Sequence, residues 1–178
     1  DALTDADDNV AIGQTALGSD TLGSKSVAVG RAALAAQNFT SATDTYNTAV
    51  GFQAGEAVTT GVQNTLIGGL AGDALTTGNN NAVLGYNSLT ANTTGASNVA
   101  IGAHTLAANT TASNNVAVGL SALDANTTGA SNCGIGLDAG GGITTGSHNI
   151  GIGNGTFVDS VVLTTGGNNI IIGNFSRT

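Results

Sequence analysis

Residues 98–102 of this chain read Asn-Val-Ala-Ile-Gly, and this five-residue stretch recurs with small changes ten times. Each copy ends in a glycine 17 residues after the previous one, except for gaps of 21 residues before Gly51 and 20 residues before Gly173. A fixed period of this kind is typical of repeat proteins whose units stack on one another. The copies occupy residues 9–13, 26–30, 47–51, 64–68, 81–85, 98–102, 115–119, 132–136, 149–153 and 169–173.

Each copy has the pattern of a short β-strand followed by a turn. Counted from its first residue, position 4 is always aliphatic, position 2 is mostly β-branched, position 3 is usually small and position 5 is glycine. The alternation predicts a strand whose aliphatic side chains face a core, so Ile101→Asp is expected to unfold several coils. The sequence therefore predicts an all-β protein with one domain over residues 1–178: a parallel β-solenoid, or β-roll, of about ten 17-residue coils.

Positions 9 and 12 of the repeat vary together. Where position 9 is leucine, as at Leu106, position 12 is polar, as at Asn109. Where position 9 is glycine, as at Gly72, position 12 is aliphatic, as at Leu75. A close-packed interior requires this, because two aliphatic side chains would overpack one slot and none would leave a void. The covariation predicts a closed coil with a shared interior.

Position 1 is asparagine in nine of the ten copies. In a stack of coils, equivalent side-chain amides form a ladder in which each bonds to the one above and below. A threonine ladder is also expected from the Thr-Thr pairs at positions 13 and 14, of which one member can face outward. We expect a structural ladder, and no binding site, at Asn9, Asn47, Asn64, Asn81, Asn98, Asn115, Asn132, Asn149 and Asn169.

The composition disfavours several classes of binding partner. Three basic residues against eleven acidic ones give a net charge of −8, which disfavours nucleic acid and anionic membrane surfaces as partners. No apolar run is long enough to span a bilayer, so no membrane insertion is expected. The chain begins at Asp1 without a visible signal peptide, from which we expect a processed or excised piece of a longer product.

The residues that usually carry chemistry are few and scattered. His104 and His148 occupy different repeat positions, and no nucleophile–His–acid arrangement or pair of His ligands is visible. The acidic cluster within residues 5–8 is expected to be a solvated end. Cys133, alone and at position 2, is expected to be a small buried hydrophobic residue. We therefore predict a protein that is not an enzyme, without catalytic residues, metal site or cofactor.

Two coils are longer than the rest, by four residues within 37–46 and by three residues within 157–165. Insertions in a solenoid emerge as loops on one face, often the binding face. Surface loops without function explain them equally well. Most aromatic residues lie near these insertions or near the C-terminus, so contacts with a partner are expected from Phe39, Tyr46, Phe52 and Phe157.

The repeated unit Asn-Val-Ala-Ile-Gly, followed by a small residue and a short loop, resembles the head repeats of trimeric autotransporter adhesins, the YadA-like family. It is also similar to the Asn-Thr-Thr-Gly-spaced repeats of phage tail-fibre proteins. The resemblance covers residues 9–173. It implies a left-handed β-roll assembled as a homotrimer and located outside the cell, on a cell surface or in a virion fibre. The implied function is that of an adhesin head or receptor-binding fibre shaft, with a host-surface or glycan receptor as partner.

Physical reasoning favours self-association independently of the resemblance. Each coil offers only three or four aliphatic side chains, and aromatic residues are 3% of the chain. A lone thin solenoid of this composition buries little apolar area per residue. Packing the small position-3 faces of several chains together would add burial.

Two other functions are open alternatives. Asp1 and Thr178 both fall at repeat position 10, so the last coil of one chain could be completed by the start of another. Because exposed strand edges are templates for pairing, this predicts a structural subunit that stacks head-to-tail into an extracellular filament. The third function is an ice-binding threonine array, which Thr→Tyr changes at Thr93 and Thr110 in a thermal hysteresis assay would test.

Overall fold

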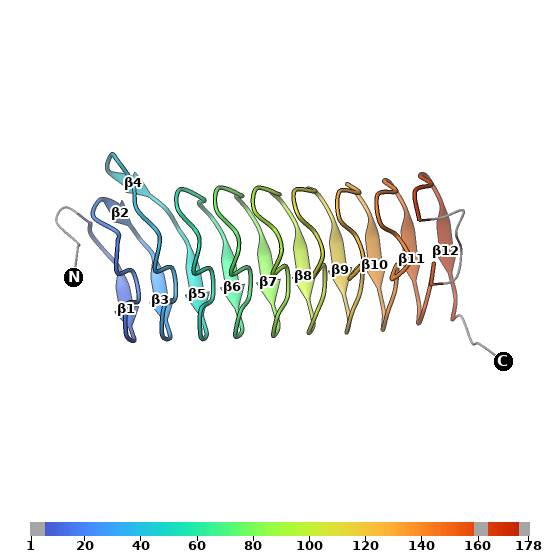
Figure 1. Cartoon of the computed structure of the whole chain (residues 1–178), viewed down its shortest axis with the longest axis horizontal. Coiled ribbons are helices and arrows are strands. Elements are labelled where there is room, and N and C mark those ends of the chain that lie inside the picture. Colours follow the sequence, from blue (N-terminus) through green and yellow to red (C-terminus); the bar gives the residue numbers. More distant parts are fainter. Residues whose placement is uncertain (1–5, 159–163, 175–178) are drawn as a thin grey trace.

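Figure 1 shows the chain as a rod of stacked coils in a computed structural model that describes residues 6–158 and 164–174. One ten-stranded sheet runs along the rod in the order β1-β3-β5-β6-β7-β8-β9-β10-β11-β12, and a two-stranded sheet, β2-β4, lies near its N-terminal end. The strands are β1 Val10–Ile12, β2 Gly23–Ser24, β3 Val27–Val29, β4 Thr43–Asp44, β5 Thr48–Val50, β6 Thr65–Ile67, β7 Ala82–Leu84, β8 Val99–Ile101, β9 Val116–Val118, β10 Cys133–Ile135, β11 Ile150–Ile152 and β12 Ile170–Ile172.

Every strand of the large sheet consists of positions 2 to 4 of one repeat, and all neighbours pair in parallel and in register. Ala100 of β8, for example, pairs with Val83 of β7 and with Ala117 of β9. Parallel strands need a connection of about a dozen residues or more. The rest of each 17-residue unit supplies that connection by returning around the coil. The predicted all-β parallel solenoid is therefore confirmed.

The strands face the opposite way from the prediction. Position 3 points into the coil, where Ala100 is fully buried and so is the larger Leu66. Position 4 points outward, and Ile101 keeps 39% of its surface exposed. The expectation that positions 2 and 4 are buried was wrong, and with it the reason to expect unfolding from Ile101→Asp. An alternating sequence pattern divides the side chains of a strand between its two faces, but it does not indicate which face lies inside the coil.

The other half of each coil supplies the large side chains of the core. A Cβ added to Gly55 would lie 2.6 Å from Leu66 Cδ1 of the next coil and 3.1 Å from Leu34 Cδ2 of the previous one. Glycine at position 9 therefore makes room for side chains of neighbouring coils as well as for position 12 of its own. The predicted shared interior is confirmed by the burial of Leu17, Leu34, Leu89, Leu106 and Leu123 at position 9 and of Val58, Leu75 and Ile143 at position 12.

The polar residues at position 12 are also buried, which the sequence pattern did not reveal. The Asn109 Oδ1 accepts the Ala112 N–H at 2.9 Å, and its Nδ2 donates to the Ala112 carbonyl at 3.2 Å. Buried amides need such partners, because an unpaired polar group in the interior is costly. Position 12 therefore either fills the core or closes the turn that leads to the next strand.

The glycine at position 5 is required by stacking as well as by the turn. Gly102 has a φ of +129°, and a Cβ at this residue would lie 2.5 Å from the carbonyl oxygen of Gly119 in the next coil. Adjacent coils reach the ordinary strand spacing of about 4.8 Å only because this corner carries no side chain.

Three further corners of the coil use the left-handed backbone conformation, in most coils with residues other than glycine. In the coil that contains β8, these are Ser97 (φ 58°), His104 (φ 57°) and Leu106 (φ 49°). Each such residue costs about 1–2 kcal/mol relative to a right-handed one. Hydrogen bonds to the flanking coils hold these corners, such as Ser97 N–H to Asn79 O at 2.9 Å.

Candidate interaction surface

The asparagines at position 1 form the predicted ladder inside the coils. Asn98 is fully buried, and both its backbone N–H and its Nδ2 donate to Asn81 Oδ1, at 3.0 and 3.2 Å. The same Nδ2 donates to the Ala112 carbonyl at 2.9 Å and so joins two parts of one coil. Because these amides are satisfied internally, the ladder is structural, as predicted.

A buried polar network bridges the one break in this ladder, where Ser26 replaces asparagine. Gln37 donates through Nε2 to Asp20 Oδ2 at 2.6 Å and to Ser26 Oγ at 2.9 Å, and its Oε1 accepts from Asn47 Nδ2 at 2.8 Å. The Ser26 and Thr45 hydroxyls are 2.5 Å apart. Residues from three consecutive coils thus replace one missing amide. In the sequence, only the exceptions at positions 1 and 12 indicate this network.

Two of the four predicted contact residues are not available to a partner. Phe39 keeps 7% of its surface exposed and Phe157 keeps 2%, so their prediction as contact residues was wrong. Phe157 occupies position 9 of its coil, and a Cβ on Gly151 opposite would lie 3.1 Å from its ring. Tyr46 and Phe52 are exposed, at 53% and 48%. Part of the second insertion, residues 159–163, lies outside the described residues.

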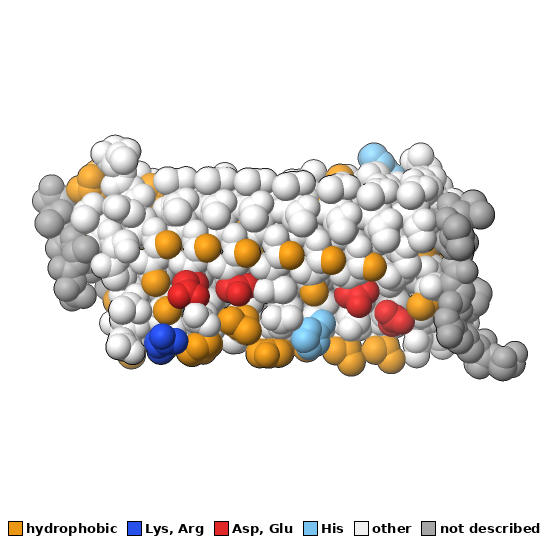
Figure 2. All heavy atoms as spheres, in the orientation of Figure 1, with side chains coloured by type: hydrophobic (Ala, Val, Ile, Leu, Met, Phe, Trp, Pro, Cys, Tyr) orange, Lys and Arg blue, Asp and Glu red, His pale blue; other side chains and the backbone are white. Residues whose placement is uncertain are grey.

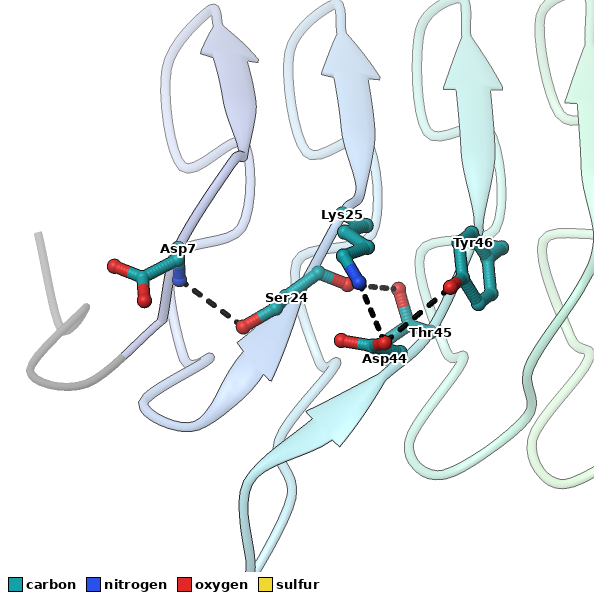
Figure 3. A network of polar contacts seen from close by, with 6 residues as sticks. All are labelled: Asp7, Ser24, Lys25, Asp44, Thr45 and Tyr46. Atoms are coloured by element: carbon teal, nitrogen blue, oxygen red, sulfur yellow. Dashed lines mark hydrogen bonds and ion pairs between the residues drawn. The ribbon is translucent and has the colours of Figure 1, made fainter.

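The base of the first insertion is held by an exposed polar cluster (Figure 3). Lys25 Nζ lies 2.6 Å from Asp44 Oδ2 and 5.4 Å from the centre of the Tyr46 ring, and the Tyr46 hydroxyl donates to the same carboxylate at 3.3 Å. The hydrogen bond with Asp44 raises the pKa of Lys25, and the same bond lowers the pKa of Asp44. Both groups are at the surface, so the pair orients the loop and adds little to stability.

The outward side of the ten-stranded sheet is an aliphatic face. We define this aliphatic face as positions 2 and 4 of the ten strands, none of which carries a charged residue. Its large exposed members are Val10, Ile12, Val50, Leu84, Ile101, Ile135, Ile152, Ile170 and Ile172. Position 6 extends it around the corner with four more exposed residues, Phe52, Tyr86, Leu120 and Leu137. Figure 2 shows hydrophobic side chains along the lower edge of the rod, below the acidic ones.

Cys133 lies on this aliphatic face. It occupies position 2 of β10 and is half-buried, so the expectation that it fills the interior was wrong for the same reason as for the other position-2 residues. Burial raises the pKa of its thiol. The face therefore carries one native thiol that reports on whether it is covered.

The threonine pairs divide their roles between stacking and surface. At position 13, Thr76 Oγ1 donates to the Thr93 carbonyl of the next coil at 2.8 Å, and Thr93 does the same to Thr110 at 3.2 Å. At position 14, Thr77 and Thr94 are exposed. The outward threonines form one row along the rod. Thr→Tyr substitutions that test ice binding by this row therefore belong at position 14 rather than at position 13.

The remaining titratable residues that the structure describes do not converge. His104 Nδ1 lies 3.2 Å from Asn87 Nδ2, and its ring meets Tyr86 edge-on with centroids 5.7 Å apart, while His148 is exposed in another part of the coil. Burial, followed by the nearby Asp138 charge, raises the pKa of Asp124. Within residues 6–158 and 164–174, no group of three or more His, Cys, Asp or Glu residues is placed to hold a metal ion.

These features define an all-β protein of the parallel β-solenoid class with one uncharged aliphatic face. Comparisons with protein-family models, with curated proteins and with solved structures found no match to this chain. Over the described part of the chain, no helix has the length and hydrophobicity needed to cross a bilayer.

Proposed function

We propose that this chain is a segment of a homo-oligomeric extracellular fibre, an adhesin head or receptor-binding shaft, that acts by binding and not by catalysis. The observation that carries the proposal is the aliphatic face. It follows all ten strands, so it is roughly 45 Å long and at least about 7 Å wide. Exposed apolar patches of more than a few hundred Å² on soluble proteins mark interaction sites.

A second copy of the same chain is the partner that fits this face best. The coils repeat at a constant strand spacing, so parallel copies side by side match row for row along the rod. The net charge of −8 opposes association, but no acidic residue lies at position 2 or 4. The trimer implied by the sequence resemblance would place the aliphatic faces of three copies together and remove them from water.

Mass in solution tests the assembly. Sedimentation equilibrium of the wild-type chain should show a smallest species of three times the 17.1 kDa chain mass. Ile101→Lys and Ile135→Lys each place a charge on the aliphatic face and should show a smallest species of one chain, with an unchanged circular dichroism spectrum. Thr94→Lys, on the exposed threonine row, is the matched control and should leave the mass unchanged. A wild-type chain that sediments as a single chain at every concentration would contradict the proposal.

Cys133 provides a test of register that needs no mutation. In a parallel, in-register assembly the thiols of neighbouring copies lie at the same level of the aliphatic face, because all copies present β10 there. A short bismaleimide should therefore link two copies through Cys133 and leave one thiol of a trimer unpaired. Alkylation should be slower in the assembly than in the Ile101→Lys variant, whose added charge lies two strands away from Cys133. Equal alkylation rates would mean that the face is open in solution.

The binding role is supported by the exposed aromatic residues near the N-terminal end of the rod. Tyr46 packs with Lys25, and Phe52 lies under Arg31, with 5.2 Å from the guanidinium carbon to the ring centre. Beads coated with the chain should adhere to cells or glycan surfaces, and Tyr46→Ala with Phe52→Ala should reduce adhesion. Tyr86→Ala, an exposed aromatic in mid-rod, is the control. Beads that adhere to no such surface would rule out the adhesive role.

A further inference from the structure

Every junction between neighbouring strands of the large sheet uses the same two backbone hydrogen bonds. The N–H at position 2 donates to the position-1 carbonyl of the next coil, as Val99 does to Asn115 at 2.8 Å. The position-5 N–H of the next coil donates back to position 4, as Gly119 does to Ile101 at 2.8 Å. The position-1 N–H of the next coil also donates to the asparagine Oδ1, as Asn115 does to Asn98 at 3.0 Å, except after Ser26, where Asn47 donates to Thr45 Oγ1. Each coil therefore has two different edges, and one edge fits the other.

Among the described residues, the first and last strands of the large sheet each present one half of such a junction. At the β12 end, the groups at these positions are the Ile170 N–H, the Ile172 carbonyl and the Asn169 Oδ1. At the β1 end, they are the N–H and carbonyl of Asn9 and the N–H of Gly13. None of these groups has a hydrogen-bond partner among residues 6–158 and 164–174. Unpaired strand edges of this kind are templates for pairing with another chain.

We infer that the β12 edge of one copy pairs with the β1 edge of a second copy, so that rods join head to tail into a filament. A second copy is the partner that fits these edges. The hydrogen-bond donors and acceptors at the β12 edge match those at the β1 edge in the same order as at the internal junctions of the sheet. The described residues nearest to the β12 edge, 149–158 and 164–174, contain no charged residue. This end-to-end contact is distinct from the aliphatic face and does not depend on it.

Gly173 makes the β12 end competent for stacking. At the internal position-5 glycines, as at Gly102, an added Cβ would lie within about 2.5 Å of the carbonyl oxygen of the next glycine, whereas at Gly173 it would meet nothing within 4 Å. A side chain at Gly173 would thus be tolerated by contacts within one rod but would collide with Gly13 of a second copy. The backbone there, at φ +147°, also disfavours other residues, so a second variant is needed.

Ile170→Pro is that second variant. Proline removes the N–H that points to the open edge, and prolines are accepted on edge strands. Ile150→Pro is its matched control, because the same position in β11 donates to the Asn169 carbonyl at 2.8 Å within the chain. We expect Ile150→Pro to lose β-structure by circular dichroism and Ile170→Pro to retain it.

Negative-stain microscopy and light scattering of the purified chain over a concentration series test the inference. Wild-type particles should lengthen with concentration in steps of one rod, roughly 48 Å for ten coils. Gly173→Ala and Ile170→Pro should stay at one rod length. Wild-type particles that remain one rod long, or variants that still lengthen, would overturn it. The fibre proposal is read separately, from mass per unit length, because Ile101→Lys and Ile135→Lys change filament width and not filament length.

Discussion

Leu106 and Asn109 together test whether each coil holds one aliphatic side chain in a shared slot. Leu106 is fully buried, so Leu106→Gly leaves a cavity that should lower the free energy of unfolding by about 3–5 kcal/mol. The usual entropic cost of glycine is offset here, because Leu106 already has a φ of 49°, where glycine is unstrained.

Asn109→Leu alone should also destabilise the chain. It adds a second aliphatic side chain to an occupied slot, at about 1–3 kcal/mol, and it removes two hydrogen bonds to Ala112, at about 1 kcal/mol each. The double variant reproduces the arrangement that the chain already uses at Gly72 and Leu75. It should therefore be more stable than the sum of the two single changes predicts, by about 2–3 kcal/mol.

Urea unfolding followed by circular dichroism measures this coupling in a double-mutant cycle. Asn109→Leu combined with Leu34→Gly, four coils away, is the control, and those effects should add within about 0.5 kcal/mol because coils interact with their nearest neighbours. Additivity of Leu106→Gly and Asn109→Leu within the same margin would refute the shared slot.

Three further predictions concern the corners of the coil and its surface. Gly102→Ala should lower the free energy of unfolding by about 2–6 kcal/mol, because it adds backbone strain and a clash with the next coil. Gly173→Ala adds only the backbone strain and should lower the free energy of unfolding by about 1–3 kcal/mol. Equal losses of the two variants in urea unfolding would contradict the stacking role of Gly102. Ser97→Gly should stabilise by up to about 1 kcal/mol and Ser97→Val should destabilise, since Ser97 is left-handed with a φ of 58°; the reverse order of unfolding midpoints would exclude the left-handed corner. Lys25→Ala should return the lowered pKa of Asp44 to its ordinary range, as measured by an NMR titration. Because folding lowers this pKa, the pair contributes to stability at pH values above the unfolded-state pKa of Asp44. The contribution is lost as the pH falls through the folded-state pKa.

The position of each strand could be predicted because strand and turn preferences are local. The aliphatic residue at position 4 and the glycine that follows it, such as Ile101 and Gly102, mark one strand end in every unit. The slot shared by positions 9 and 12 could also be predicted, since a close-packed core forces compensation between Leu106 and Asn109 or their equivalents. Phe157 shows where prediction from the sequence fails. An aromatic residue near an insertion is expected to be a surface contact, but the fold places Phe157 inside its coil, opposite Gly151.

The sequence by itself therefore determined the period, the strands, the parallel stacking and the asparagine ladder, because each is repeated along the chain and depends on near neighbours. Only the tertiary structure decided which face of the strand is inside. Ala100 faces inward because the leucines of the opposite wall already fill the coil, which leaves Ile101 outside. The aliphatic face and the left-handed corners follow from how the coil closes and stacks, which no single repeat records.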